Sequence, residues 1–215
     1  MVQQTENTEN VQQEAEEIVK QQSKIADKIE QLVVSSAKVG ESGVESLSSI
    51  YDSVVSGSLS ALDQAMPADQ ERALRQVYDG LTNAGTRFAN AARFTFEEAK
   101  SQSQVFSEAE VKLAKEELAT LESLAIETFL KYRDKVSSEL SQQTNRIVEH
   151  AKTSSSDLGG AISEALRVVK NHPAELISDG ARAGVELSKS IASTLLRGSS
   201  DLLSSAAKSL DQKPE

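Results

Sequence analysis

The sequence contains no cysteine and no tryptophan, and it has only three prolines. Without cysteine, the chain forms no disulfide bond and offers no thiolate as a nucleophile or metal ligand. Aromatic residues make up 4% of the chain, so the bulkiest core-filling side chains are scarce. An interior proline costs a helix about 3 kcal/mol, so the scarcity of proline permits long, uninterrupted helices.

Segments that direct a chain into or across a membrane are also missing from the sequence. No run of residues approaches the ~18 consecutive apolar positions of a membrane-spanning helix, so we predict no transmembrane segment. Residues 1–10 are polar and acidic and lack the basic and apolar regions of a signal peptide. We therefore expect a cytoplasmic protein whose residues 1–10 form a disordered tail.

Basic residues are too few, relative to acidic ones, to form a patch that binds nucleic acid. The net charge is −10. Residues 1–66 carry 11 acidic residues against 4 lysines and no arginine, whereas residues 67–152 carry 14 acidic against 12 basic residues. Because affinity for nucleic acid comes mainly from basic residues that contact phosphates, we expect no nucleic-acid partner.

The chain is rich in residues that favour helices, and residues 11–66 carry two helical patterns. The first has spacings of four and three, as in a coiled coil, with Gln22 as a polar interruption. Its positions are Val11, Ala15, Ile18, Gln22, Ile25, Ile29 and Leu32.

The second pattern repeats every 11 residues. It includes Val33, Val44, Val55 and Met66, and the acidic positions Glu30, Glu41, Asp52 and Asp63. An 11-residue step is ~3.67 residues per turn, so these positions share one helix face. We predict that residues 11–66 form an amphipathic arm, marginally stable in water because it is rich in serine.

Residues 67–152 hold all five phenylalanines and are predicted to form a central helical hairpin. Pro67 suits the first turn of a helix. A break is expected within 101–107, where Ser107 and Glu110 have the spacing of a capping box for the next helix. The apolar positions after Glu110 predict a second helix that could exceed 40 residues, or ~60 Å.

Residues 153–215 are predicted to form C-terminal amphipathic helices. The glycine pair 159–160 marks a hinge, and Pro173 starts a further helix. Leu187, Ile191, Leu195 and Leu202 line one face of that last helix.

No arrangement of residues in the sequence indicates catalysis. The two histidines, His150 and His172, have no accompanying nucleophile motif, and their spacing does not fit a metal site. Glycine pairs lack the preceding strand and the lysine of a phosphate-binding loop. We therefore predict a protein that is not an enzyme, with no catalytic, cofactor-binding or metal-binding residue and no cofactor.

The apolar faces of the outer segments have two interpretations. They could pack in an ordinary helical bundle, as most amphipathic helices do. They could instead contact an external apolar surface, since they are long, narrow and built from small aliphatic residues. For the second interpretation, the predicted contact residues are Val33, Val44, Ile50, Val55, Leu59, Leu62, Leu187, Ile191, Leu195 and Leu202.

The stretch from Phe94 to Lys152 resembles the phasins, which coat bacterial polyhydroxyalkanoate granules. The resemblance lies in FEEAKSQSQVF, in LAKEELATLESLAIETFLKYRDKVSSELSQQ, and in the lack of cysteine and tryptophan. It implies a non-enzymatic helical protein that forms homo-oligomers through its helices and binds a hydrophobic polymer or lipid-like surface.

From the residues and this resemblance together we predict an all-α fold. It is either an elongated helical bundle or a central helical hairpin with long amphipathic arms. We predict a phasin-like coat function on a cytoplasmic granule. The alternative is a coiled-coil scaffold or interaction protein that binds partner helices.

Overall fold

The protein is an all-α helical bundle. The computed structural model describes residues 2–39, 44–101, 106–153 and 157–177. Within these residues the only pairing of β type is one isolated bridge between Phe106 and Ile177. The helices are α1 (Val2–Lys20), α2 (Ile25–Val39), α3 (Val44–Asp63), α4 (Pro67–Ser101), α5 (Glu108–Tyr132), the short 3₁₀-helix η1 (Arg133–Lys135), α6 (Ser138–Thr153), α7 (Asp157–Asn171) and α8 (Pro173–Leu176).

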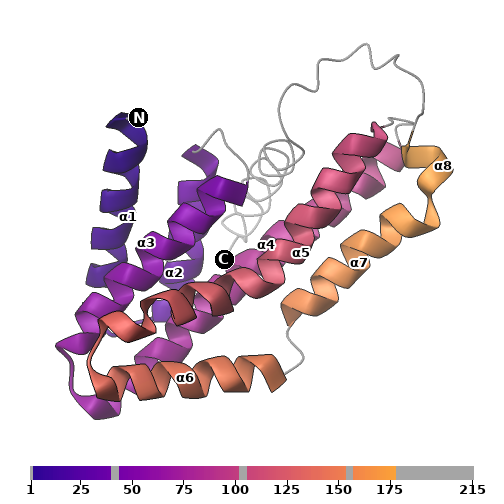
Figure 1. The fold of residues 1–215 in the computed structure, drawn as a ribbon. Helices are drawn as coiled ribbons and strands as arrows, with labels where there is room; N and C mark the ends of the chain where they lie inside the picture. Colours follow the sequence, from indigo (N-terminus) through magenta and orange to yellow (C-terminus); the bar gives the residue numbers. More distant parts are fainter. Residues whose placement is uncertain (1, 40–43, 102–105, 154–156, 178–215) are drawn as a thin grey trace, which may run out of the picture.

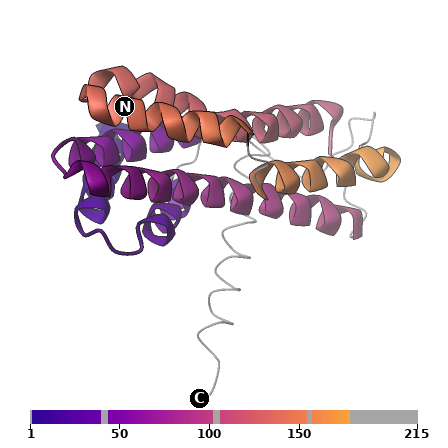
Figure 2. The same ribbon diagram turned by 90° about the horizontal axis from the view of Figure 1, so that it is seen from below.

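The long helix α4 runs through the centre of an elongated molecule (Figures 1 and 2). It packs most extensively against α2 and α7, and also against α6, α3 and α5. Helix α1 packs mainly on α3, and α3 also contacts α5. The arm predicted for residues 11–66 is therefore three helices, α1–α3, folded back on the bundle.

The first predicted pattern is interrupted by a turn at Gln22. Its apolar positions are all buried, on α1 and α2. The chain reverses between these helices, and Gln22 and Lys24 both adopt a left-handed backbone with φ of 51°. The reversal folds one predicted helix into an antiparallel pair. Helix α1 already begins at Val2, so the expected disordered tail is helical from that residue.

The 11-residue pattern is divided between two helices rather than lying on one. Helix α2 ends at Val39 and α3 begins at Val44. Val33 and Val55 are fully buried in the core, whereas Met66, in the turn before α4, is 68% exposed. Among the described residues of 33–66, these positions thus do not form one continuous stripe, because they lie on two separate helices that pack on each other.

The predicted break before residue 107 is confirmed, but the long helix after it is not. Helix α4 ends at Ser101 and α5 begins at Glu108, where the Val111 amide donates to the Ser107 carbonyl over 3.1 Å. The second helix stops at Tyr132, η1 follows, and Val136 is extended. The described part of segment 67–152 therefore contains three α-helices and η1, and α4 makes its larger interfaces with α2 and α7.

In the last described segment, Pro173 begins α8 as predicted. The glycine pair 159–160, predicted as a hinge, lies inside α7. Asp157 stands in the first turn of this helix, where a carboxylate favours the positive end of the helix dipole. The Phe106 amide donates to the Leu176 carbonyl over 2.7 Å, which ties α8 to the start of α5.

Small residues let the helices approach closely. A Cβ atom added at Gly57 of α3 would stand 2.1 Å from the Gln12 carbonyl oxygen of α1. One added at Gly80 of α4 would stand 2.6 Å from the Ala26 carbonyl oxygen of α2. The small residues thus allow close packing of α1 on α3 and of α2 on α4, while the marginal stability expected for this arm stays a prediction.

Candidate functional site

The predicted surface-contact residues that the structure describes lie in the core. Each of the five is at most 4% exposed: Val33, Ile50, Val55, Leu59 and Leu62. The side chain of Val44 lies outside the described part of the structure, as do Leu187, Ile191, Leu195 and Leu202. In this conformation the five pack inside the protein. Contact between them and an external surface stays a prediction, and it requires helices to separate.

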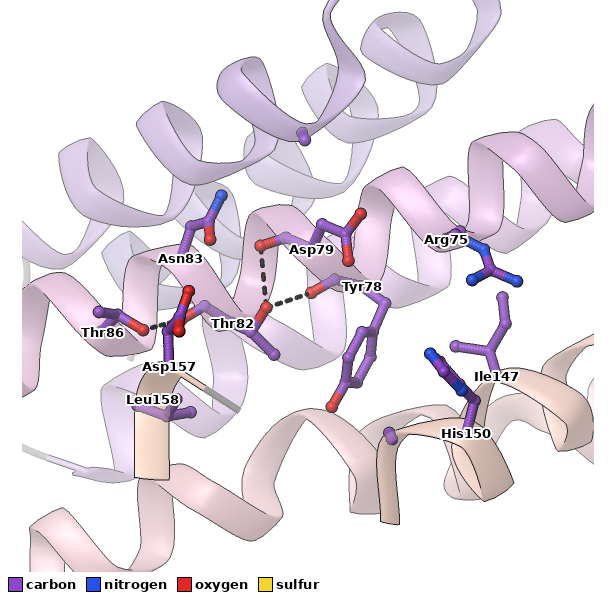
Figure 3. A pocket seen from close by; sticks show the side chains of 12 residues that line it. Arg75, Tyr78, Asp79, Thr82, Asn83, Thr86, Ile147, His150, Asp157 and Leu158 are labelled. Carbon is purple, nitrogen blue, oxygen red and sulfur yellow. Dashed lines mark hydrogen bonds between the residues drawn. The ribbon is translucent and has the colours of Figure 1, made fainter. Parts of the chain in front are cut away.

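A polar cleft of about 570 Å³ opens between α2, α4, α6 and the start of α7 (Figure 3). At one end lie Arg75, Ile147 and His150, and at the other Thr86 and Asp157, with the Tyr78 ring between them. The remaining lining residues are Ala26, Asp79, Thr82, Asn83, Ala151 and Leu158. No pattern in the sequence predicts this cleft, because its walls come from helices far apart in the chain.

The titratable groups of the cleft are Arg75, Tyr78, Asp79, His150 and Asp157. Partial burial raises the pKa of the Asp79 carboxyl, while nearby Arg75 and His150 lower it. Burial also raises the pKa of the Tyr78 hydroxyl, and the Asp79 charge raises it further. The cleft therefore presents both signs of charge and selects no one ligand charge.

The threonine hydroxyls of the cleft are already engaged. Thr82 Oγ1 lies 3.1 Å from the Tyr78 carbonyl oxygen, and Thr86 Oγ1 donates to the Thr82 carbonyl oxygen over 2.9 Å. Neither hydroxyl is paired with a base that would activate it as a nucleophile. A search of the described residues finds no group of three histidine, cysteine or acidic side chains placed to hold a metal ion. The cleft is best described as a polar surface depression.

Glu117 of α5 is a partly buried carboxyl with an unusual environment. Its Oε2 atom is buried without a hydrogen-bond partner, and burial raises the pKa of the carboxyl from 4.5 to about 7. The folded protein therefore binds this proton more tightly than the unfolded chain does. The free energy of unfolding should fall as the pH rises from about 4.5 to about 7, and level off above that range.

We expect Glu117→Gln to raise the free energy of unfolding by about 1 kcal/mol near pH 8, a value reduced for partial solvent exposure. Near pH 4, where the carboxyl is protonated in both states, the gain should vanish. Urea unfolding followed by circular dichroism at both pH values measures this. Glu127→Gln, at an exposed position of the same helix, is the control. Equal effects of the two substitutions would contradict the assignment.

Polar contacts connect α1–α3, here called the N-terminal unit, to the α4–α7 body. Glu30 of α2 forms an ion pair with Arg87 of α4. Asp52 of α3 accepts a hydrogen bond from Lys131 Nζ of α5 over 2.5 Å, and this bond is the main cause of the raised pKa of Lys131.

A third contact joins the end of α3 to the start of α6. Asp63 Oδ1 accepts a hydrogen bond from the Ser137 amide over 2.9 Å. Hydrogen bonds from the side chain and backbone of Ser137 lower the pKa of Asp63. The carboxylate thereby stands at the N-terminal end of α6, which favours a negative charge.

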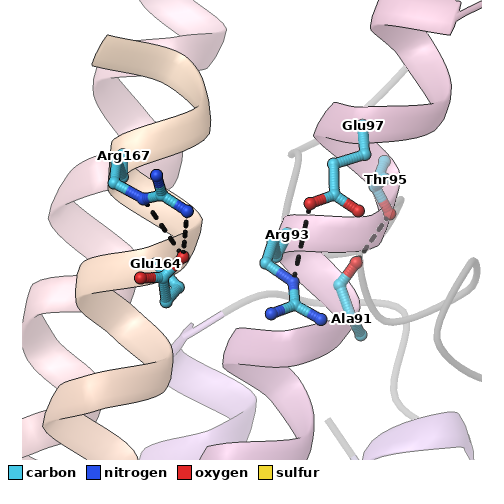
Figure 4. Close-up of polar contacts among 6 residues, drawn as sticks. All are labelled: Ala91, Arg93, Thr95, Glu97, Glu164 and Arg167. Atoms are coloured by element: carbon cyan, nitrogen blue, oxygen red, sulfur yellow. Dashed lines mark hydrogen bonds and ion pairs between the residues drawn. The ribbon is translucent and has the colours of Figure 1, made fainter. Parts of the chain in front are cut away.

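The ion pairs on α4 and α7 are of a different kind (Figure 4). Arg93 and Glu97 pair within α4 at 3.8 Å. Glu164 accepts hydrogen bonds from the guanidinium of Arg167 within α7, the shorter at 2.6 Å. Pairs of this kind stabilise a single helix by about 0.2–0.5 kcal/mol and do not connect one helix to another.

Comparisons with known proteins give a family but no function. A family model described as a family of unknown function (DUF6781) matches residues 1–212. No curated protein and no solved structure matches the chain. Among the described residues, no helix combines the length and apolar character needed to cross a membrane.

Proposed function

Because the chain belongs to the DUF6781 family of unknown function, we propose its function from its own sequence and geometry. We propose a non-enzymatic coat protein that binds a hydrophobic surface, such as a polyhydroxyalkanoate granule or a lipid-like particle. Binding occurs when the N-terminal unit swings away from the α4–α7 body and its apolar faces transfer to that surface.

The observation that carries this proposal is how the N-terminal unit is attached. One turn, residues 64–66, joins α3 to α4. Across the seam the Tyr51 hydroxyl of α3 donates to the Leu81 carbonyl of α4, and aliphatic side chains also meet the other helix, as Ile29 does at Gly80. Burial of such side chains is non-directional, so an external apolar surface can replace the bundle core at little net cost. Met66, 68% exposed in the turn, adds an apolar side chain at the pivot.

The scaffold interpretation is the second candidate, and the burial of the five predicted contact residues favours it. A bundle whose apolar faces stay covered would bind partners through its polar exterior and would ignore hydrophobic particles. Because the described chain is helical before any surface is present, a rise in helix content would not distinguish the candidates. A measurement of whether the N-terminal unit separates from the α4–α7 body distinguishes the coat function from the scaffold function.

A crosslink between α3 and α5 tests the opening. Since the chain has no cysteine, an Asp52→Cys/Lys131→Cys variant reacts with a cleavable bis-maleimide only at these two positions. The crosslink holds the N-terminal unit closed. We expect co-sedimentation with polyhydroxybutyrate particles to weaken by at least about ten-fold, because the binding-competent state becomes rare. Cleavage of the linker should restore binding.

The matched control carries the same linker within one helix. A Glu164→Cys/Arg167→Cys variant, crosslinked on α7, should bind particles as the unmodified protein does. Crosslinking is preferred to substitution of a core residue such as Val55, which would unfold the bundle. Undiminished binding by the closed α3–α5 variant contradicts the opening. Absence of binding by the unmodified protein favours the scaffold function.

A further inference from the structure

Besides apolar packing and a buried hydrogen bond from the Tyr51 hydroxyl to the Leu81 carbonyl over 2.8 Å, three acidic residues contact the rest of the protein from the N-terminal unit, and they belong to one sequence pattern. Glu30, Asp52 and Asp63 are three of the four acidic positions with an 11-residue step, and Glu41, the fourth, lies outside the described residues. Each described member contacts a different helix: Glu30 meets α4, Asp52 meets α5, and Asp63 meets the start of α6.

The direction of these contacts is the same in all three cases. The acid comes from α2 or α3, and the cation or amide donor comes from the α4–α7 body. This follows the charge distribution of the chain, since residues 1–66 contain no arginine and an excess of acidic residues. Residues 67–152 are also slightly acidic, with 14 acidic against 12 basic residues, so the attraction is local to these three contacts.

Two of these acids, Glu30 and Asp52, are more buried than the acids of ordinary surface pairs, whereas Asp63 is exposed. The Glu30 side chain is 12% exposed and the Asp52 side chain 24%, although their partners Arg87 and Lys131 are about half exposed. Partly buried pairs are screened less by water and salt than fully exposed pairs, whose median contribution is near zero. They lie across the seam that must open, unlike the pairs within α4 and α7.

We infer that Glu30, Asp52 and Asp63 form an electrostatic clasp that keeps the N-terminal unit closed on the α4–α7 body and so restrains surface binding. The inference rests on the proposed function for its biological consequence, but the clasp itself is a property of the free protein. Breaking the clasp raises the population of the open form, and apparent affinity for a surface rises in proportion.

Charge reversal tests the clasp in the free protein. An Ile29→Cys substitution places a thiol in the buried seam beside Gly80, and its rate of reaction with a soluble thiol reagent reports opening. In this background, Arg87→Glu combined with Lys131→Glu sets like charges opposite Glu30 and Asp52. We expect the labelling rate to rise by about ten-fold or more.

Two further variants separate the clasp from a general effect of charge. Arg72→Glu with Lys112→Glu makes the same changes on α4 and α5, at exposed residues that pair only within their own helices. This control should leave the labelling rate unchanged. The exchanged variant Glu30→Arg/Asp52→Lys/Arg87→Glu/Lys131→Glu restores opposite charges and should return the rate toward the starting value.

The same variants, without the reporter thiol, are then mixed with polyhydroxybutyrate particles. If the reversed variant binds particles more tightly, and the exchanged variant binds them as the starting protein does, both the clasp and the coat function are supported. Faster labelling without particle binding by any variant supports the clasp and contradicts the coat function. If the reversed variant is labelled no faster than the Arg72→Glu/Lys112→Glu control, the clasp is overturned. This holds whether or not either variant binds particles.

Discussion

Replacing Phe129 by alanine is expected to lower the free energy of unfolding by about 3–5 kcal/mol, the range for a large aromatic side chain removed from a core. Phe129 of α5 is fully buried, and its ring lies 6.0 Å from that of Tyr78 on α4. The substitution leaves a cavity between α4 and α5. These long helices are held by contacts along their length, so they cannot move together to fill it. Urea unfolding followed by far-ultraviolet circular dichroism measures the loss.

Phe94→Ala is the matched control on α4. The Phe94 ring is 46% exposed, with the guanidinium of Arg93 at 4.7 Å from its centre. Its removal exposes no cavity and loses only a surface contact of about 0.5–1 kcal/mol. If the two substitutions cost the same, α5 does not pack on the core as described.

Gly57→Ala is expected to lower the free energy of unfolding by about 2–3 kcal/mol, as overpacking of a tight interface does. The added methyl would overlap the Gln12 carbonyl oxygen at 2.1 Å, and that oxygen belongs to the backbone of α1. A backbone carbonyl cannot rotate away as a side chain can. Helices α1 and α3, the most extensively packed pair among the described helices, must therefore move apart.

Gly160→Ala on α7 is the control for helix propensity alone. A methyl group there meets no atom within 4 Å. Since alanine is the better helix former, this substitution should stabilise the protein by about 0.5–1 kcal/mol. An equal gain at Gly57 would show that α1 does not lie against α3.

The positions of several helix ends followed from the sequence because local chemistry sets them. Pro67 and Pro173 each begin a helix, since proline fits the first turn, where the amide has no partner. The gap between α4 and α5 coincides with the polar stretch that ends at Ser107. Where a terminating or capping residue is present, the sequence is enough.

Other breaks had no such signal. The turn between α1 and α2 uses Gln22 and Lys24 in a left-handed backbone that normally favours glycine. Packing of α1 on α3 and of α2 on α4 compensates for the strain, and those contacts are distant in the chain. The break after Tyr132 is similar, because Asp63 of α3 binds the Ser137 amide that starts α6.

The sequence by itself determined the helical class, the absence of cysteine chemistry and the apolar periodicity, because composition and local spacing fix these properties. Burial of the five predicted contact residues that the structure describes was decided only by the tertiary structure. A helical stripe looks the same whether it faces a core or a granule, since burial is non-directional. The recurrence of acidic residues every 11 positions was visible in the sequence. Its role in joining α2 and α3 to α4, α5 and α6 depended on long-range folding, which places Arg87, Lys131 and Ser137 opposite the three acids.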